Sequence, residues 1–216
     1  MIIKPNSITQ KQKQEILELI KENAEAISIN VFDKSDQIYD YLKTREIVKA
    51  EEYLSRLTST GINRTHIIIN TDDTDTIMGF ILYHQVVNKP KDTAIICTIV
   101  SDKFRRKGIL RSMMEELQNN YDSITLSCFL EKVEIYSKFG FQIEGQWATQ
   151  VGMYYGEIED GEIVTIDDES LDKTETVTRA LKKFQKMDSD WRHTINLFYM
   201  KNQDEANRVK RFLENF

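Results

Sequence analysis

The stretch from Thr93 to Leu117 constrains this chain most, because it reads as a strand, a basic turn and a helix in immediate succession. Residues 94–100 are rich in β-branched side chains, which favours a buried strand. The helix that follows has an apolar face at helical spacing, made of Ile109, Leu110, Met113, Met114 and Leu117. The stretch therefore predicts a strand that leads through a short turn directly into a helix.

The turn of this stretch, residues 101–108, is basic and contains one glycine. Its charged side chains are Lys103, Arg105, Arg106 and Lys107, and Gly108 follows them. At such a junction the unpaired N–H groups and the positive end of the helix dipole point into one small volume. The pattern indicates a phosphate site. The alternative is an ordinary junction with a solvated basic loop, and one R-x-x-G motif does not separate the two.

Composition limits the classes of protein to consider. The 216 residues suffice for one large domain, or for a domain with an appendage. A formal net charge of −6 disfavours a general nucleic-acid or membrane-surface binder and mildly favours an amine substrate. Cys97 and Cys128 give neither a disulfide framework nor metal-ligand spacing, so we expect no metal. Without a signal-peptide core or a transmembrane run, we expect a cytoplasmic protein.

The elements around this stretch follow from hydrophobic periodicity. Amphipathic helices are predicted over 9–24 and 35–57, the second with a break near Lys43–Thr44. The remaining predicted elements are strands 65–70, 77–87 and 94–100, a helix to about 119, strand 123–127, helix 130–139 and a strand region 141–156. The order ααβββαβαβ predicts an α+β fold with a mixed, mostly antiparallel sheet flanked by helices.

Two motifs within this order resemble those of the GNAT superfamily of acyl-CoA-dependent N-acetyltransferases. Residues 100–111, VSDKFRRKGILR, resemble its pyrophosphate-binding motif R/Q-x-x-G-x-G/A. Arg105 and Gly108 occupy the first two defining positions, whereas Leu110 stands where the family prefers Gly or Ala. Residues 136–141, YSKFGF, resemble the family's Y-x-K-x-G-F ending of its fourth helix. The resemblance covers about residues 1–155 and implies a GNAT-like domain over 1–156.

The resemblance implies a function and a site. It implies an acyltransferase (EC 2.3.1.-) that moves an acetyl group from acetyl-CoA to a primary amine by direct attack in a ternary complex. The pyrophosphate would meet the turn and helix start, and the pantetheine arm would run along the end of the strand. The residues so assigned to acetyl-CoA are Ile99, Val100, Arg105, Arg106, Lys107, Gly108, Ile109, Leu110 and Arg111. Tyr136 stands where many relatives have a general acid that protonates the departing thiolate.

The coenzyme region departs from the common pattern in two further positions. Relatives often have Asn seven residues and Ala four residues before the tyrosine, where this chain has Phe129 and Lys132. No general base is evident. His84 and Glu144 could act through water, although a lone strand histidine is more often packed or at the surface.

Other interpretations stay open. Cys128 has no His-Asp partner pattern nearby and reads as a small buried residue rather than a nucleophile. The basic turn as a nucleic-acid patch is the weaker interpretation, because no aromatic residues are interleaved. Two alternative functions remain. One is a non-catalytic acyl-CoA- or partner-binding protein on the same fold, and the other is acetylation of a macromolecular amine, either a protein lysine or a tRNA-linked amine.

Residues 157–216 lie beyond the resemblance and predict a small C-terminal extension. The segment 157–169 is acidic, with a turn at Asp160–Gly161 and a β run at 163–166. A helix over 171–187, a strand over 194–200 and a helix over 204–216 follow. This β-α-β-α pattern is too regular for a disordered tail. We expect it to cover the substrate side or to form a homodimer interface.

Overall fold

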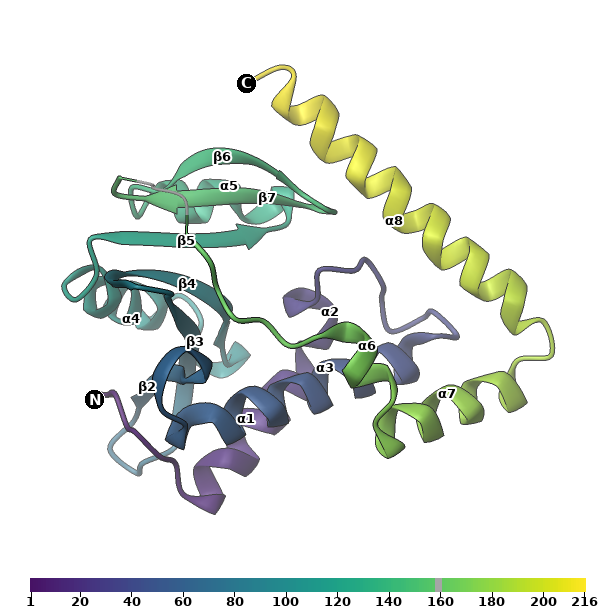
Figure 1. Cartoon of the computed structure of the whole chain (residues 1–216), viewed down its shortest axis with the longest axis horizontal. Coiled ribbons are helices and arrows are strands. Elements are labelled where there is room, and N and C mark those ends of the chain that lie inside the picture. Colours follow the sequence, from purple (N-terminus) through teal and green to yellow (C-terminus); the bar gives the residue numbers. More distant parts are fainter. Residues whose placement is uncertain (158–160) are drawn as a thin grey trace.

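The structure of this chain is a computed structural model that describes residues 1–157 and 161–216 (Figure 1). Its centre is a seven-stranded sheet of order β1-β2-β3-β4-β5-β7-β6, in which only β4 and β5 run parallel. The strands are β1 (Ile2–Ile3), β2 (Thr65–Thr71), β3 (Ile77–Val86), β4 (Lys89–Val100), β5 (Ser123–Cys128), β6 (Gln142–Trp147) and β7 (Gln150–Tyr155). The predicted α+β class with a mixed, mostly antiparallel sheet is therefore confirmed.

Alternation along the strands places apolar side chains on both faces of this sheet. Ile68 and Ile81 are paired across β2 and β3 and face one core cluster. Their neighbours Ile67, Ile69 and Phe80 face a second cluster on the other side. Both faces are therefore covered by helices, as strands with apolar residues on both faces require.

The helices cover the two faces in separate groups. α1 (Gln10–Glu22), which is capped by Thr9, and α3 (Tyr39–Ser55) pack on the second cluster, next to the short helix α2 (Ala24–Ile27). α4 (Ile109–Gln118) and α5 (Leu130–Ser137) pack on the first cluster. The predicted break near Lys43–Thr44 is wrong, because α3 is continuous. Lys43 pairs with Asp40 at 2.6 Å, and the Thr44 hydroxyl donates to the Asp40 carbonyl at 2.7 Å.

The strands β4 and β5 separate shortly after they begin. Residues 92–94 of β4 pair with residues 123–125 of β5, and the register ends there. On its other side β4 stays paired with β3 as far as Val100. Leu82 faces Cys97 and Tyr83 faces Ile95, so Ile96 is an extra residue in a β-bulge. The second half of β4 therefore has an open edge toward the gap between the two strands.

The predicted β-α-β-α extension is wrong in its strands. Among the described residues after 160 the elements are α6 (Asp168–Asp172), α7 (Glu175–Met187) and α8 (Trp191–Leu213). Residues 163–166 form no strand, and the predicted strand 194–200 lies within α8. Trp191, Ile195 and Phe198 recur at helical spacing and pack on a cluster with Phe184 of α7. Packing of this face outweighs the β-like alternation of residues 194–200.

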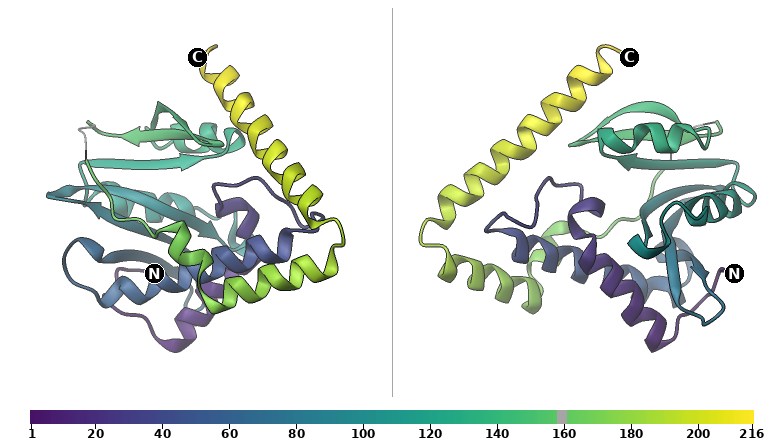
Figure 2. Two further views of the ribbon diagram at one scale, coloured as in Figure 1. Left: turned by 45° about the vertical axis from the view of Figure 1, so that its right-hand side comes forward. Right: turned by 180° about the vertical axis from the view of Figure 1, so that it is seen from behind.

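The extension packs along one side of the sheet domain (Figures 1 and 2). We call residues 161–167 the strap. It is held by a hydrogen bond from the Val87 N–H to the Glu162 carbonyl at 2.8 Å. α7 packs against α3, and α8 then crosses to β6 and β7, where Val209 is fully buried. Asp160 of the predicted Asp160–Gly161 turn lies outside the described residues, and the domain boundary at 156 stays a prediction.

Candidate functional site

The basic turn forms a backbone concavity at the start of α4. Arg106 and Gly108 adopt left-handed conformations with φ of 61° and 80°. The first i to i−4 bond of the helix runs from the Ser112 N–H to the Gly108 carbonyl at 2.9 Å, so the N–H groups of residues 109–111 have no acceptor within the helix. A Cβ on Gly108 would meet no heavy atom within 4 Å. Backbone conformation, rather than space, favours glycine there.

The side chains around this turn are exposed and basic. Arg105 pairs with Asp102 at 2.7 Å and donates to the Asn23 side chain at 3.2 Å, which ties the turn to the end of α1. Lys107 lies over the Phe104 ring at 5.1 Å. Leu110 is half-buried and packs against the core, so the core takes up part of its bulk. Geometrically the turn can bind an anion, as expected of a phosphate site, and the individual residue roles stay predictions.

A cavity of about 670 Å³ lies where β4 and β5 separate. Its walls come from β4 and β5, from α3 and α5, from the β6–β7 hairpin and from the strap. The β4 residues at its wall are 92–98. Ile99 and Val100 are not among the lining residues; their side chains pack into the two core clusters on opposite faces of the sheet. Their backbone lies beyond the residues that pair with β5.

Tyr136 projects from α5 into this cavity. Burial raises the pKa of its phenol well above the usual value, and the nearby Cys128 thiol raises it further. The Thr98 hydroxyl lowers the pKa of Tyr136 in part. The Thr98 hydroxyl and the Tyr136 phenol do not, however, meet the geometry of a hydrogen bond. The ring contacts Phe141 edge-on at a centroid distance of 5.9 Å. The phenol is therefore held in place and protonated at neutral pH, as a proton donor must be.

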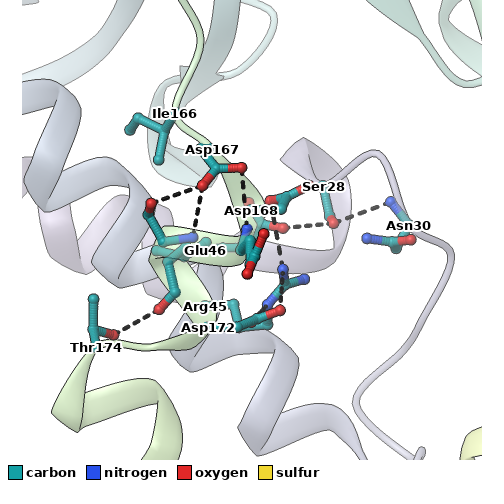
Figure 3. A network of polar contacts seen from close by, with 12 residues as sticks. Ser28, Asn30, Arg45, Glu46, Ile166, Asp167, Asp168, Asp172 and Thr174 are labelled. Atoms are coloured by element: carbon teal, nitrogen blue, oxygen red, sulfur yellow. Dashed lines mark hydrogen bonds and ion pairs between the residues drawn. The ribbon is translucent and has the colours of Figure 1, made fainter.

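Glu46 is a half-buried carboxylate that lines the same cavity, and sequence analysis did not single it out. Figure 3 shows its polar contacts. It accepts a hydrogen bond from the Ser28 hydroxyl at 2.6 Å, and Ser28 Oγ accepts one from the Asn30 N–H at 3.1 Å. Burial raises the pKa of Glu46, and the positive charge of Lys49 lowers it in part. A carboxyl whose pKa lies nearer to neutrality can exchange protons with a bound amine.

His84, one of the predicted bases, also borders the cavity. Its Nδ1 lies 3.1 Å from the Arg64 carbonyl, and its ring contacts Tyr53 edge-on at 5.3 Å. Burial lowers the pKa of His84, so the imidazole is neutral. Its Nε2 has no hydrogen-bond partner among the residues that the structure describes. Glu144, the second predicted base, is exposed at the edge strand β6 and lines the cavity.

The remaining residues singled out from the sequence also lie at the cavity. Cys128 is buried, with its Sγ 3.7 Å from Met153 Sδ, and burial raises the pKa of its thiol to about 12. A thiol that stays protonated fits a packed residue better than a nucleophile. Phe129 and Lys132 both line the cavity, and Lys132 Nζ donates to the Ala26 carbonyl of α2 at 2.8 Å.

Comparison with known proteins decides the family. A family model described as the acetyltransferase (GNAT) family matches residues 30–141, just over half of the chain. This chain belongs to the GNAT acetyltransferase family. It is therefore an acyltransferase of the GNAT type, as predicted. A search of curated proteins found no match.

Solved structures of similar fold agree with the family. The PaiA N-acetyltransferase of Thermoplasma acidophilum in complex with coenzyme A has a TM-score of 0.56 at 13% identity, covering 73% of this chain and 99% of that one. PH1933 of Pyrococcus horikoshii has a TM-score of 0.53 at 18% identity, covering 74% and 99%. A GCN5-related N-acetyltransferase of Kribbella flavida has a TM-score of 0.51 at 12% identity, covering 72% and 98%. At these identities the similarity is one of fold.

No helix in the described ranges is both long and apolar enough to cross a membrane. Within residues 1–157 and 161–216 no three His, Cys, Asp or Glu side chains gather as a metal site would require.

Proposed function

We propose that this GNAT protein transfers an acetyl group from acetyl-CoA to a primary amine by direct attack in a ternary complex. The observation that carries the proposal is one cavity, in the gap between β4 and β5, that is lined by both the half-buried Tyr136 phenol and the half-buried Glu46 carboxylate. A proton donor and a proton acceptor are the two groups that aminolysis of a thioester needs.

The donor is proposed to bind along the open edge of β4. Residues 109–111 and the left-handed Arg106 and Gly108 would place N–H groups toward the pyrophosphate. The pantetheine arm would pair with the β4 backbone beyond Ala94, where β5 no longer does. This path leads from the turn at the end of β4 back toward Thr98 and the cavity. The thioester would then reach Tyr136 from the coenzyme side.

The acceptor is proposed to enter from the side of α3 and the strap. Glu46 receives the proton of the bound ammonium, directly or through a water, so that the neutral amine can attack the thioester carbonyl. The C–N bond forms, the C–S bond breaks and the thiolate takes the proton of Tyr136. The nitrogen, which becomes an amide N–H, returns one proton to the Tyr136 phenolate. Since Ile163 and Thr165 of the strap line the same cavity, the extension would contribute to acceptor selection.

A thiol-release assay with acetyl-CoA over a panel of primary amines tests the proposal. We expect turnover with at least one amine and loss of most of it in Tyr136→Phe and Glu46→Gln. Isothermal titration with acetyl-CoA measures donor binding separately. Binding without turnover on any amine would favour the non-catalytic alternative, and acetyl-CoA that fails to bind would contradict both.

A further inference from the structure

Lys132 lies in the wall of the reaction cavity, one turn before Tyr136 on α5. Residues four apart on a helix share one face, with their Cβ atoms about 5–6 Å apart. A thioester placed to receive the proton of Tyr136 therefore lies within the reach of the four-carbon Lys132 stem. We propose that Lys132 is itself an acetyl acceptor and that this protein acetylates its own cavity wall. This inference rests on the proposed function.

The position of the amine is fixed by a contact across the cavity wall. Lys132 Nζ donates to the Ala26 carbonyl of α2 at 2.8 Å, so the side chain extends from α5 toward α2 and not into solvent. The segment after α2 is held in turn by β7 and α8. Gln150 Nε2 donates to the Ser28 carbonyl at 3.0 Å, and Asn202 Oδ1 accepts from the Val31 N–H at 2.9 Å. These contacts hold in place the segment next to Ala26, whose carbonyl accepts the hydrogen bond of the Lys132 amine.

The Lys132 amine forms no ion pair with a carboxylate in the described ranges of the chain. Glu131, the adjacent acid on α5, pairs instead with Arg208 of α8 at 2.8 Å. Burial lowers the pKa of Lys132, and the nearby Cys128 opposes this in part; the positive charge of Arg105 lowers the pKa again, and Glu131 opposes it least. A lowered pKa increases the fraction of neutral, nucleophilic amine at a given pH.

The proposed step balances with the groups already present. The ammonium releases one proton to solvent, and the neutral Nζ attacks the thioester carbonyl of acetyl-CoA. The new N–C bond forms as the C–S bond breaks, and coenzyme A leaves as the thiol with a proton from Tyr136. The phenol regains a proton from the nitrogen, which becomes an amide N–H. That N–H can still donate to the Ala26 carbonyl. The positive charge of Lys132 is lost, and the amide accepts no second acetyl group.

Mass spectrometry of the intact chain and its peptides tests this inference. The full chain is incubated with acetyl-CoA in the absence of any added amine, and acetylation is measured at Lys132 and at Lys138. Lys138 is the matched control, because it caps the C-terminal end of the same helix but is exposed and pairs with Glu134 at 2.9 Å. Acetic anhydride serves as the passive reagent. It should acetylate the exposed Lys138 faster than Lys132.

Acetyl-CoA is expected to reverse that preference. Lys132 should gain one acetyl group per chain, Tyr136→Phe should slow the labelling about tenfold or more, and Lys132→Arg should remove it while Lys138→Arg leaves it unchanged. Labelling of Lys138 in preference to Lys132, or equal labelling of Lys132 in Tyr136→Phe, would overturn the inference. Transfer to added amines without any Lys132 acetylation would overturn it while leaving the proposed function intact. Failure of acetyl-CoA to bind would overturn both.

Discussion

The carboxylate of Glu46 and the hydroxyl of Ser28 are joined by a hydrogen bond of 2.6 Å, which links α3 to the segment after α2. Ser28 is fully buried, so the hydroxyl that orients this carboxylate is itself shielded from water. The neighbouring Arg45 binds Asp172 and Asp168 of α6 (Figure 3). Two adjacent residues of α3 thus have separate roles, one at the cavity and one at the extension.

Glu46→Gln should lower kcat/KM for the amine by about 10²-fold or more, since a positioned base contributes about that much. As burial raises the pKa of Glu46, wild-type activity should rise with pH through a value above that of an ordinary glutamate. The variant should lose this acidic limb. Steady-state pH profiles of both proteins check this prediction. An unchanged acidic limb in the variant would show that another group gives rise to it.

The same substitution has a predicted effect on stability. A folded-state pKa raised above the unfolded value means that Glu46 favours folding when protonated, below the unfolded pKa of about 4.3, and that this contribution is lost as pH rises through the folded pKa. Glu46→Gln, which stays neutral, should therefore raise Tm at neutral pH. The difference should disappear in acid. A lower Tm at neutral pH would show that the Ser28 and Lys49 contacts outweigh burial.

Tyr136→Phe should lower kcat by about 10²-fold with little change in acetyl-CoA affinity, because the ring that packs on Phe141 remains. Burial raises the pKa of the phenol, so wild-type activity should show no alkaline fall from this group below about pH 10. Stopped-flow thiol release and titration calorimetry measure the two quantities. A large loss of affinity instead would indicate a binding role.

Gly108→Ala and Gly108→Asp separate backbone strain from charge at the proposed phosphate site. Alanine at a φ of 80° should cost about 1 kcal/mol of stability and weaken acetyl-CoA binding slightly. Aspartate tolerates this conformation better but adds a carboxylate beside the phosphates, so its affinity should fall about tenfold below that of Gly108→Ala. Titration calorimetry with both variants decides it. Equal acetyl-CoA affinities of the two variants would show that the phosphates do not bind at this turn.

Arg45→Gln should loosen the extension. The Arg45 side chain is 14% exposed and binds Asp172 at 2.6 Å and Asp168 at 3.4 Å, so its loss should cost about 1–2 kcal/mol. KM for the acceptor should rise more than KM for acetyl-CoA, because the strap borders the cavity. Arg179→Gln is the control: that arginine is 77% exposed and pairs with Glu175, and its loss should cost under about 0.5 kcal/mol. Equal effects in both variants would contradict the prediction.

The fold of the sheet domain was largely predictable, because its local patterns and its packing agree. Each local pattern favours one conformation, and the structure adopts it: a strand for the β-branched run of β4, a left-handed turn at Gly108 and a helix for the apolar face of α4. The α8 region differs. Ile195, Leu197 and Tyr199 alternate as a strand would, yet Ile195 with Trp191 and Phe198 also marks a helix face, and only the partner cluster on α7 and α3 decides between them.

Glu46 was missed for a related reason. A charged residue within an amphipathic helix is normally on the solvated face. Leu42 and Ala50, four residues to either side, are both buried, so Glu46 lies in the middle of the buried stripe of α3. This spacing is readable in the sequence, and a carboxylate at the centre of such a stripe is a signal for a functional site. That a cavity lies beside it follows only from the divergence of β4 and β5.

The burial of Val209 has a consequence for the order in which the chain folds. Val209 of α8 belongs to the same core cluster as Ile68 and Ile81, although more than a hundred positions separate them in the sequence. A nascent chain therefore still lacks part of this cluster when the whole sheet has been synthesised. The apolar surface of α5, β6 and β7 that α8 covers stays open until the last turns of that helix emerge from the ribosome. Chains that end early would expose this surface, which makes them targets for chaperones and proteases.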